Sequence, residues 1–143
     1  MWVFLAISAS LFWGLSYVLN EEIYKRISVY TAICVLSLAS FLITLGLAHF
    51  NGNLKSDLVA IGSSKTLAFY LLGGIFALLL AELCIGFSIV AKNATVAGLI
   101  EVSYPLFIAL FSYFLFKHQI TMPTVIGGMV IFLGIFIVYF FNK

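Results

Sequence analysis

The chain has 143 residues, of which 64% are hydrophobic and only 8% are charged. A soluble domain carries about 25% charged residues, so this chain cannot cover a surface that faces water, and lipid must cover it instead. The net charge of +2 is scattered, with no basic run, which excludes a nucleic-acid partner. Cys34 and Cys84 lie in apolar runs and no Cys/His ligand spacing is present, so we expect no disulfide, metal or other cofactor.

Hydropathy divides the chain into five segments, each close to the ~20 residues that a helix needs to cross a bilayer core. Backbone groups in lipid must be satisfied within the segment, so these segments are predicted to be helices, and no barrel pattern competes. The predicted spans cover residues 2–20, 29–50, 66–90, 95–116 and 124–141. Because no linker is long enough to separate domains, we expect one all-α transmembrane domain over residues 1–143.

The first span is expected to continue as helix into the membrane interface. Glu21 and Glu22 each precede a basic residue by four positions, an order that supports a helix end. The N-terminus lacks the basic region of a signal peptide and its apolar run continues past Ser10, so we expect it to remain as a span. The stretch from Asn51 to Lys65 is predicted to be the longest loop.

The distribution of lysines and arginines gives almost no information on the orientation of the chain in the membrane. Counting spans places three of them on the N-terminal side and four on the other. The three are Lys55, Lys65 and Lys117, and the four are Lys25, Arg26, Lys92 and Lys143. Either one dominant helix fixes the orientation, or the chain inserts both ways and pairs with an inverted copy, since inverted repeats are common in secondary transporters.

Two carboxylates, Glu82 and Glu101, lie inside apolar spans, where an ionisable group is costly and usually marks a transport path. Glu82 lies ten residues before Lys92 and Glu101 nine residues after it, which puts both roughly 14–15 Å deep on neighbouring helices. Burial disfavours the charged carboxylate, and so does a second carboxylate nearby. Such a pair can bind a proton and exchange it for a cation or substrate. Alternatively, each Glu is protonated and serves only packing.

The residues that follow Glu101, namely Ser103, Tyr104 and Pro105, add polar groups beside its carboxyl. The ring of Pro105 is incompatible with the usual helical bond to the carbonyl four residues earlier, which is that of Glu101. Ser103 and Tyr104 add hydroxyl groups beside the freed carbonyl. We therefore expect a helix kink at Pro105, and we expect Ser103 and Tyr104 to join the carboxylates in binding substrate or protons.

The first span carries a polar and aromatic face, with Ser10, Trp13, Tyr17 and Asn20 at positions i, i+3, i+7 and i+10. Trp13 lies too deep for the aromatic belt at the membrane interface. Trp13 and Tyr17 are predicted either to form a cavity wall that stacks on an organic substrate or cation, or to pack in the core.

The last span contains two glycines, Gly127 and Gly134, that lie seven residues apart and so share a helix face. Small residues on one face allow the backbones of two membrane helices to approach closely. We expect this face to pack against a helix of the same chain or of a partner.

Three blocks resemble one half of an EamA-type carrier of the drug/metabolite transporter superfamily. The segment 12–17 (Phe-Trp-Gly-Leu-Ser-Tyr) is similar to the opening of that domain's first helix. Segments 93–107 and 126–136 resemble its turn into a proline-containing fourth helix and its glycine-containing last helix. Two positions depart from the family pattern, at residues 32–36, where the family often has an arginine, and at 117–119, where it often has an acidic residue.

The resemblance implies a five-helix repeat, half the length of the family's ten-span members, and a transporter rather than an enzyme. Together with the carboxylates, it indicates proton-coupled movement of a small metabolite or organic cation across the bacterial inner membrane. The expected assembly is a homodimer in the lipid bilayer, in an antiparallel arrangement. The alternatives are a non-transporting membrane subunit, or one half of a heterodimeric carrier or lipid-linked sugar flippase.

Overall fold

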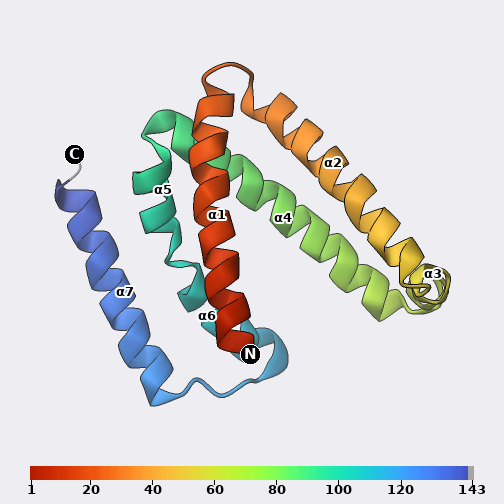
Figure 1. The fold of residues 1–143 in the computed structure, drawn as a ribbon. Coiled ribbons are helices and arrows are strands. Elements are labelled where there is room, and N and C mark those ends of the chain that lie inside the picture. Colours follow the sequence, from red (N-terminus) through yellow and green to blue (C-terminus); the bar gives the residue numbers. More distant parts are fainter. Residues whose placement is uncertain (142–143) are drawn as a thin grey trace. The chain divides into compact units, whose positions relative to one another are not determined.

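The computed structural model describes residues 1–141, in which helices alternate with short connections and no strand occurs (Figure 1). Five helical segments in this range are long and apolar enough to cross a membrane. The helices are α1 (Trp2–Tyr24), α2 (Val29–Phe50), α3 (Leu54–Ser63), α4 (Lys65–Ala91), α5 (Ala94–Glu101), α6 (Tyr104–Phe116) and α7 (Met122–Phe141). The predicted all-α membrane fold is confirmed. Lys143, counted above for orientation, lies outside the described residues.

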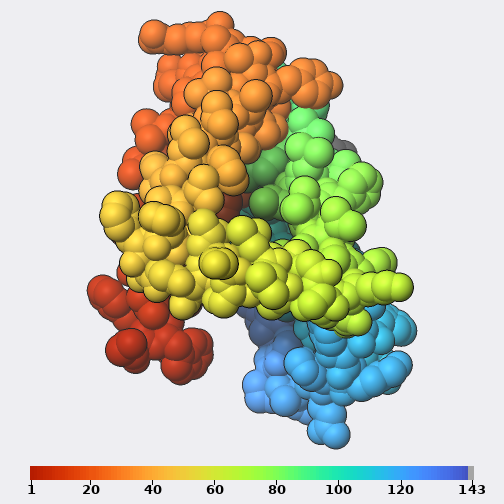
Figure 2. All heavy atoms as spheres, turned by 90° about the vertical axis from the view of Figure 1, so that its right-hand side faces the viewer, coloured from red at the N-terminus to blue at the C-terminus, as the bar shows by residue number. Residues whose placement is uncertain are grey.

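The spans follow the hydropathy closely, with two differences. The stretch predicted as the longest loop contains a helix, α3, which joins α2 to α4 at the end of their hairpin (Figures 1 and 2). The predicted span 95–116 is two helices, α5 and α6, separated at Val102 and Ser103. Hydropathy registers only how apolar a window is. It therefore gives no sign of a short helix such as α3, or of a break that depends on backbone hydrogen bonds.

The described chain divides into two compact units. One contains Met1–Glu21 and the residues from Ser88 onward, and the other contains Glu22–Phe87. In the first unit α7 packs against α5 and α6. A Cβ on Gly128 of α7 would collide with the Leu106 side chain of α6, so the absence of a side chain allows this approach. The single domain over residues 1–143 stays a prediction.

In the second unit, α2 begins where the Ser28 side chain accepts a hydrogen bond of 3.2 Å from the backbone N–H of Thr31. Val29, in the first turn of α2, is buried and faces Gly86 of α4. A Cβ on Gly86 would lie 2.6 Å from Cγ1 of Val29, closer than two carbon atoms approach. Gly86 is therefore where α4 approaches the start of α2.

Most large apolar side chains remain exposed along the spans, for example Phe4 at 74%, Phe76 at 65% and Phe132 at 63% of their surface. Exposed apolar side chains also occur on α2, α3 and α4, which are coloured orange to green in Figure 2, for example Phe41, Leu58 and Phe69. A surface of this kind needs lipid or a partner chain to cover it.

The two environments of glycine in α4 give a matched test of packing. Gly86→Ala should lower the free energy of unfolding by about 1–3 kcal/mol, because it overpacks a contact with a β-branched side chain that has little rotamer freedom. Gly74→Ala, in the same helix, meets no atom within 4 Å and should be neutral or stabilising, since Ala favours helix. Thermal unfolding in detergent measures both. Equal melting temperatures for the two variants would contradict the close approach.

Candidate functional site

The Glu101 carboxyl is held by a residue of the first span. Glu101 is the last residue of α5 and is half-buried. The hydroxyl of Tyr17 in α1 donates a hydrogen bond to its Oε2 atom. Two of the predicted site residues, 84 positions apart in sequence, are thus brought together.

The backbone beside this carboxyl leaves the α-helical pattern. The N–H of Val102 still makes the α-helical bond to the Gly98 carbonyl at 3.2 Å, but the N–H of Ser103 turns back to the Ile100 carbonyl, only three residues earlier, at 3.2 Å. Helix α6 then begins at Tyr104. Pro105 lies in the first turn of α6, where its missing N–H is tolerated. The break therefore precedes the proline, and Glu101 belongs to the last turn of α5, the end of that helix that carries its carbonyl groups. Such carbonyls are acceptors for a cation or a polar ligand.

A glycine lies beneath the Tyr17 ring. A Cβ on Gly98 would lie 3.2 Å from Cδ2 and 3.6 Å from Cε2 of Tyr17. Gly98 is one turn before Glu101 on α5, so the ring rests on the same helix that carries the carboxyl its hydroxyl contacts.

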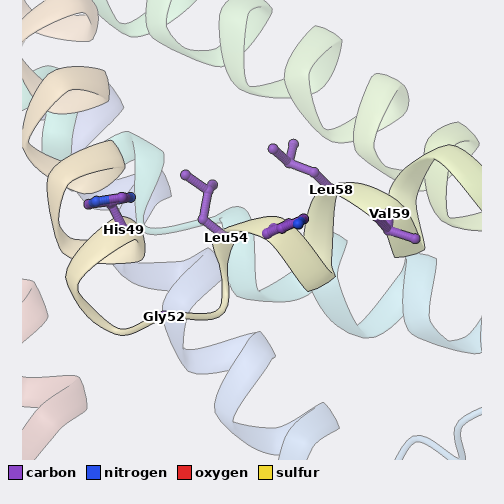
Figure 3. A pocket seen from close by; sticks show the side chains of 6 residues that line it. His49, Gly52, Leu54, Leu58 and Val59 are labelled. Atoms are coloured by element: carbon purple, nitrogen blue, oxygen red, sulfur yellow. The ribbon is translucent and has the colours of Figure 1, made fainter.

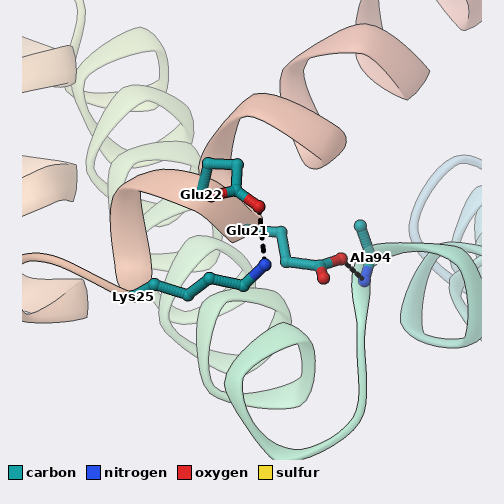
Figure 4. Close-up of polar contacts among 4 residues, drawn as sticks. All are labelled: Glu21, Glu22, Lys25 and Ala94. Atoms are coloured by element: carbon teal, nitrogen blue, oxygen red, sulfur yellow. Dashed lines mark hydrogen bonds and ion pairs between the residues drawn. The ribbon is translucent and has the colours of Figure 1, made fainter.

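A second hydrogen bond joins α1 to the start of α5. Oε2 of Glu21 accepts from the backbone N–H of Ala94 at 2.7 Å (Figure 4). The Asn93 side chain caps the same helix by accepting from the N–H of Val96 at 2.8 Å. An acidic side chain is favourable at a helix N-terminus, where N–H groups lack partners and the helix dipole is positive.

Glu22, the neighbour of Glu21, behaves differently. Its Oε1 pairs with Nζ of Lys25 at 2.6 Å, and both side chains are mostly exposed (Figure 4). The Lys25 ammonium holds this carboxylate by hydrogen bond and charge, but exposed ion pairs contribute little to stability.

The remaining predicted residues of this unit are more open. The Trp13 ring meets the Tyr17 ring edge-on, with centroids 5.9 Å apart, and is 52% exposed. Tyr104 is 55% exposed and Ser103 is half-buried. Gly127 and Gly134 of α7 are also exposed, and a Cβ on either would meet no atom within 4 Å among the described residues. The contact expected at that glycine face is thus absent within this part of the chain.

Glu82 belongs to the other unit, where it is half-buried in α4. It lies near Tyr24, the last residue of α1. The Tyr24 hydroxyl lies 3.3 Å from the position of a Cβ on Gly86. Each carboxyl therefore has a nearby tyrosine from α1, and each tyrosine packs on a glycine about one turn from that carboxyl.

Sequence reasoning missed four residues of these arrangements, namely Glu21, Tyr24, Gly86 and Gly98. A signal was present: Tyr24 follows Tyr17 by seven residues and so shares its helix face, and a glycine stands one turn from each glutamate. The open groove of about 500 Å³ near the α2–α3 corner contains none of the predicted site residues (Figure 3). It is lined by His49, Gly52, Leu54, Lys55, Leu58 and Val59.

The comparison with protein families agrees with the arrangement of the spans. The model of the EamA-like transporter family matches residues 1–140. The chain belongs to the EamA-like transporter family. No curated protein and no solved structure matches it. Since the members of this family are transporters of the drug/metabolite superfamily, the resemblance drawn from the sequence is confirmed, and the chain is an integral membrane protein of a transporter family.

The two neighbouring glutamates at the end of α1 allow a controlled test of the cap on α5. Glu21→Ala removes the acceptor of the Ala94 N–H and should lower the free energy of unfolding by about 0.5–2 kcal/mol, the usual effect of losing a helix cap. Glu22→Ala, which removes only an exposed ion pair, should leave the melting temperature unchanged. Thermal unfolding of both variants in the same detergent is the measurement, and a larger loss for Glu22→Ala would show that Glu21 is not the cap.

Proposed function

We propose that the protein is a half-size secondary transporter that moves a small metabolite or organic cation across the bacterial inner membrane by alternating access, coupled to protons. The observation that carries this proposal is the hydrogen bond from Tyr17 to the Glu101 carboxyl, beside a break in a membrane span. A carboxyl inside a span is retained at a cost that a purely structural position rarely requires.

The chemistry of this position suits exchange. The Glu101 carboxyl can hold a proton, or it can ionise and pair with a cation. The low dielectric of the span disfavours a third state, an ionised carboxylate with no cation beside it. The carbonyl end of α5 offers further acceptors. Ser103 and Tyr104 supply hydroxyls after the break, and the exposed faces of Trp13 and Tyr104 can stack on an organic cation. Glu82, beside Tyr24, is a second proton-binding group.

The working assembly is a homodimer of inverted copies. The chain supplies one five-span repeat, and an alternating-access carrier commonly uses two repeats related by inversion. The nearly even division of lysines and arginines, three against four, permits both orientations. The glycine face of α7, with open space over Gly127 and Gly134, offers close backbone approach to a helix of the second copy.

Replacing Glu101 by Gln tests the coupling. The change keeps shape and hydrogen-bonding capacity but removes the titratable proton, so proton-driven transport should be lost while the protein stays folded. Glu82→Gln should give an equal or milder defect, and Glu22→Gln, at an exposed position, should transport like the parent. The measurement is uptake or efflux of a screened panel of organic cations and metabolites in proteoliposomes under an imposed pH gradient.

If Glu101→Gln moved the same substrate against its gradient with the parental pH profile, Glu101 would not be the coupling residue. If no substrate moved with the parent protein, alone or with a co-expressed partner half, a non-transporting membrane subunit would be the better account.

The glycine face of α7 predicts the position of the dimer contact. Gly127→Leu or Gly134→Leu should weaken the dimer by about 1 kcal/mol or more, because the added bulk blocks backbone approach. Gly73→Leu in α4 is the control, since Gly73 also has open space around it but lies on another helix. Dimer populations in lipid are measured by single-molecule photobleaching over a range of protein-to-lipid ratios. An unchanged dimer in both α7 variants would place the contact elsewhere.

A further inference from the structure

The contacts between α1 and α5 follow one antiparallel register. On α1, Glu21 and Tyr17 lie four residues apart, and on α5 their partners Ala94 and Gly98 also lie four residues apart. Residues four apart lie one above the other on a helix. The two helices therefore meet along matching faces, and the next turn of α5 brings Glu101 to the Tyr17 hydroxyl.

Each contact along this register has a different physical role. The Glu21 carboxylate fixes the end of α1 at the N-terminus of α5 by a hydrogen bond to a backbone group, which no side-chain rotation on α5 can move. Gly98 leaves room for the Tyr17 ring, since even a Cβ would come within 3.2 Å of Cδ2. The hydroxyl at the far end of that ring then lies at the Glu101 carboxyl.

We propose that Gly98 and Glu21 are positioning residues for Glu101. Glu21 sets the register of α1 on α5, Gly98 admits the Tyr17 ring, and together they hold the Tyr17 hydroxyl on the carboxyl. This inference rests on the proposed function, because it concerns the same carboxyl, but it is a statement about a hydrogen bond and can be tested without a substrate.

Neither α5 nor α7 offers Glu101 a charged partner. Between Met122 and Phe141, α7, which packs against α5, contains no charged residue and only Tyr139 as an ionisable side chain. Within α5 itself Glu101 is the only charged side chain. The Tyr17 hydroxyl is thus the contact through which a change at Gly98 would reach the carboxyl.

The probe for the test is the infrared absorption of the Glu101 carboxyl in the purified full-length protein in lipid at one fixed pH. Its bands are assigned as those that disappear in Glu101→Gln. Tyr17→Phe removes the hydroxyl and defines the frequency of the carboxyl without this hydrogen bond. A role confined to packing away from the carboxyl would leave these bands in place, whereas a change in hydrogen bonding at the carboxyl moves them.

Gly98→Ala should shift the Glu101 bands part of the way to their Tyr17→Phe position, and Gly98→Val further, because the larger side chain displaces the ring more. Tyr17→Phe combined with Gly98→Val should give the Tyr17→Phe spectrum with no additional shift. Gly14→Val is the matched control, since Gly14 lies on α1 one turn from Tyr17 with no atom within 4 Å of a Cβ, and its spectrum should be parental. Glu21→Ala should shift the bands in the same direction, and Glu22→Ala should not.

Parental Glu101 bands in Gly98→Val would overturn the proposal, as would an equal shift in Gly14→Val. Should Gly98→Val fail to fold, Gly98→Ala and Glu21→Ala carry the test by themselves. Shifted bands together with parental transport in Glu101→Gln would leave the positioning correct and refute the proposed function. Unshifted bands in Gly98→Val together with lost transport in Glu101→Gln would refute the positioning and leave the proposed function standing.

Discussion

A carboxyl in an apolar span must have a hydrogen-bond partner, and much of the first unit of this structure follows from how Glu101 obtains one. Neither α5 nor α7 supplies a charged group for it, so the partner comes from α1 through Tyr17. On its way to the carboxyl the Tyr17 ring lies close against α5, at Gly98. This close approach accounts for the glycine at position 98. Because the distance from the ring to its hydroxyl is fixed, the register of the two helices decides whether the hydroxyl reaches the carboxyl. The cap from Glu21 to Ala94 sets that register near the C-terminal end of α1.

The same combination of residues occurs around Glu82, in the unit formed by Glu22–Phe87. Here Tyr24 is the counterpart of Tyr17, and Gly86 is the counterpart of Gly98. The order along the helix is reversed, because Gly86 follows its glutamate whereas Gly98 precedes it. Each unit thus contains a tyrosine from α1 that packs on a glycine about one turn from a carboxyl.

The sequence was sufficient for features that depend on composition and was insufficient for those that depend on register. The spans could be predicted, because a window of about 20 apolar residues has few other stable states in lipid. Glu101 and Tyr17 could each be selected, since a charge and a deep aromatic residue are both unusual in a span. Their contact could not, because it requires knowing which turn of α1 meets which turn of α5. Glu21 was interpreted as part of a helix end, although its carboxylate caps a different helix, and the place of Gly98 one turn before Glu101 was not recognised as a signal.

The adjacent glycines of α7 show how one short segment can serve two surfaces. Successive residues of a helix point about 100° apart, so Gly128 and Gly127 cannot share a face. Gly128 is buried against Leu106 of α6, whereas Gly127 has open space and shares its side of the helix with Gly134. One face of α7 is therefore used to pack within the chain, and the other keeps the small residues that backbone approach requires. In lipid, where apolar burial gives no driving force between helices, such close approach is the main source of association. Among the described residues no atom lies within 4 Å of a Cβ on Gly127 or Gly134, so this face has room for the dimer contact proposed above.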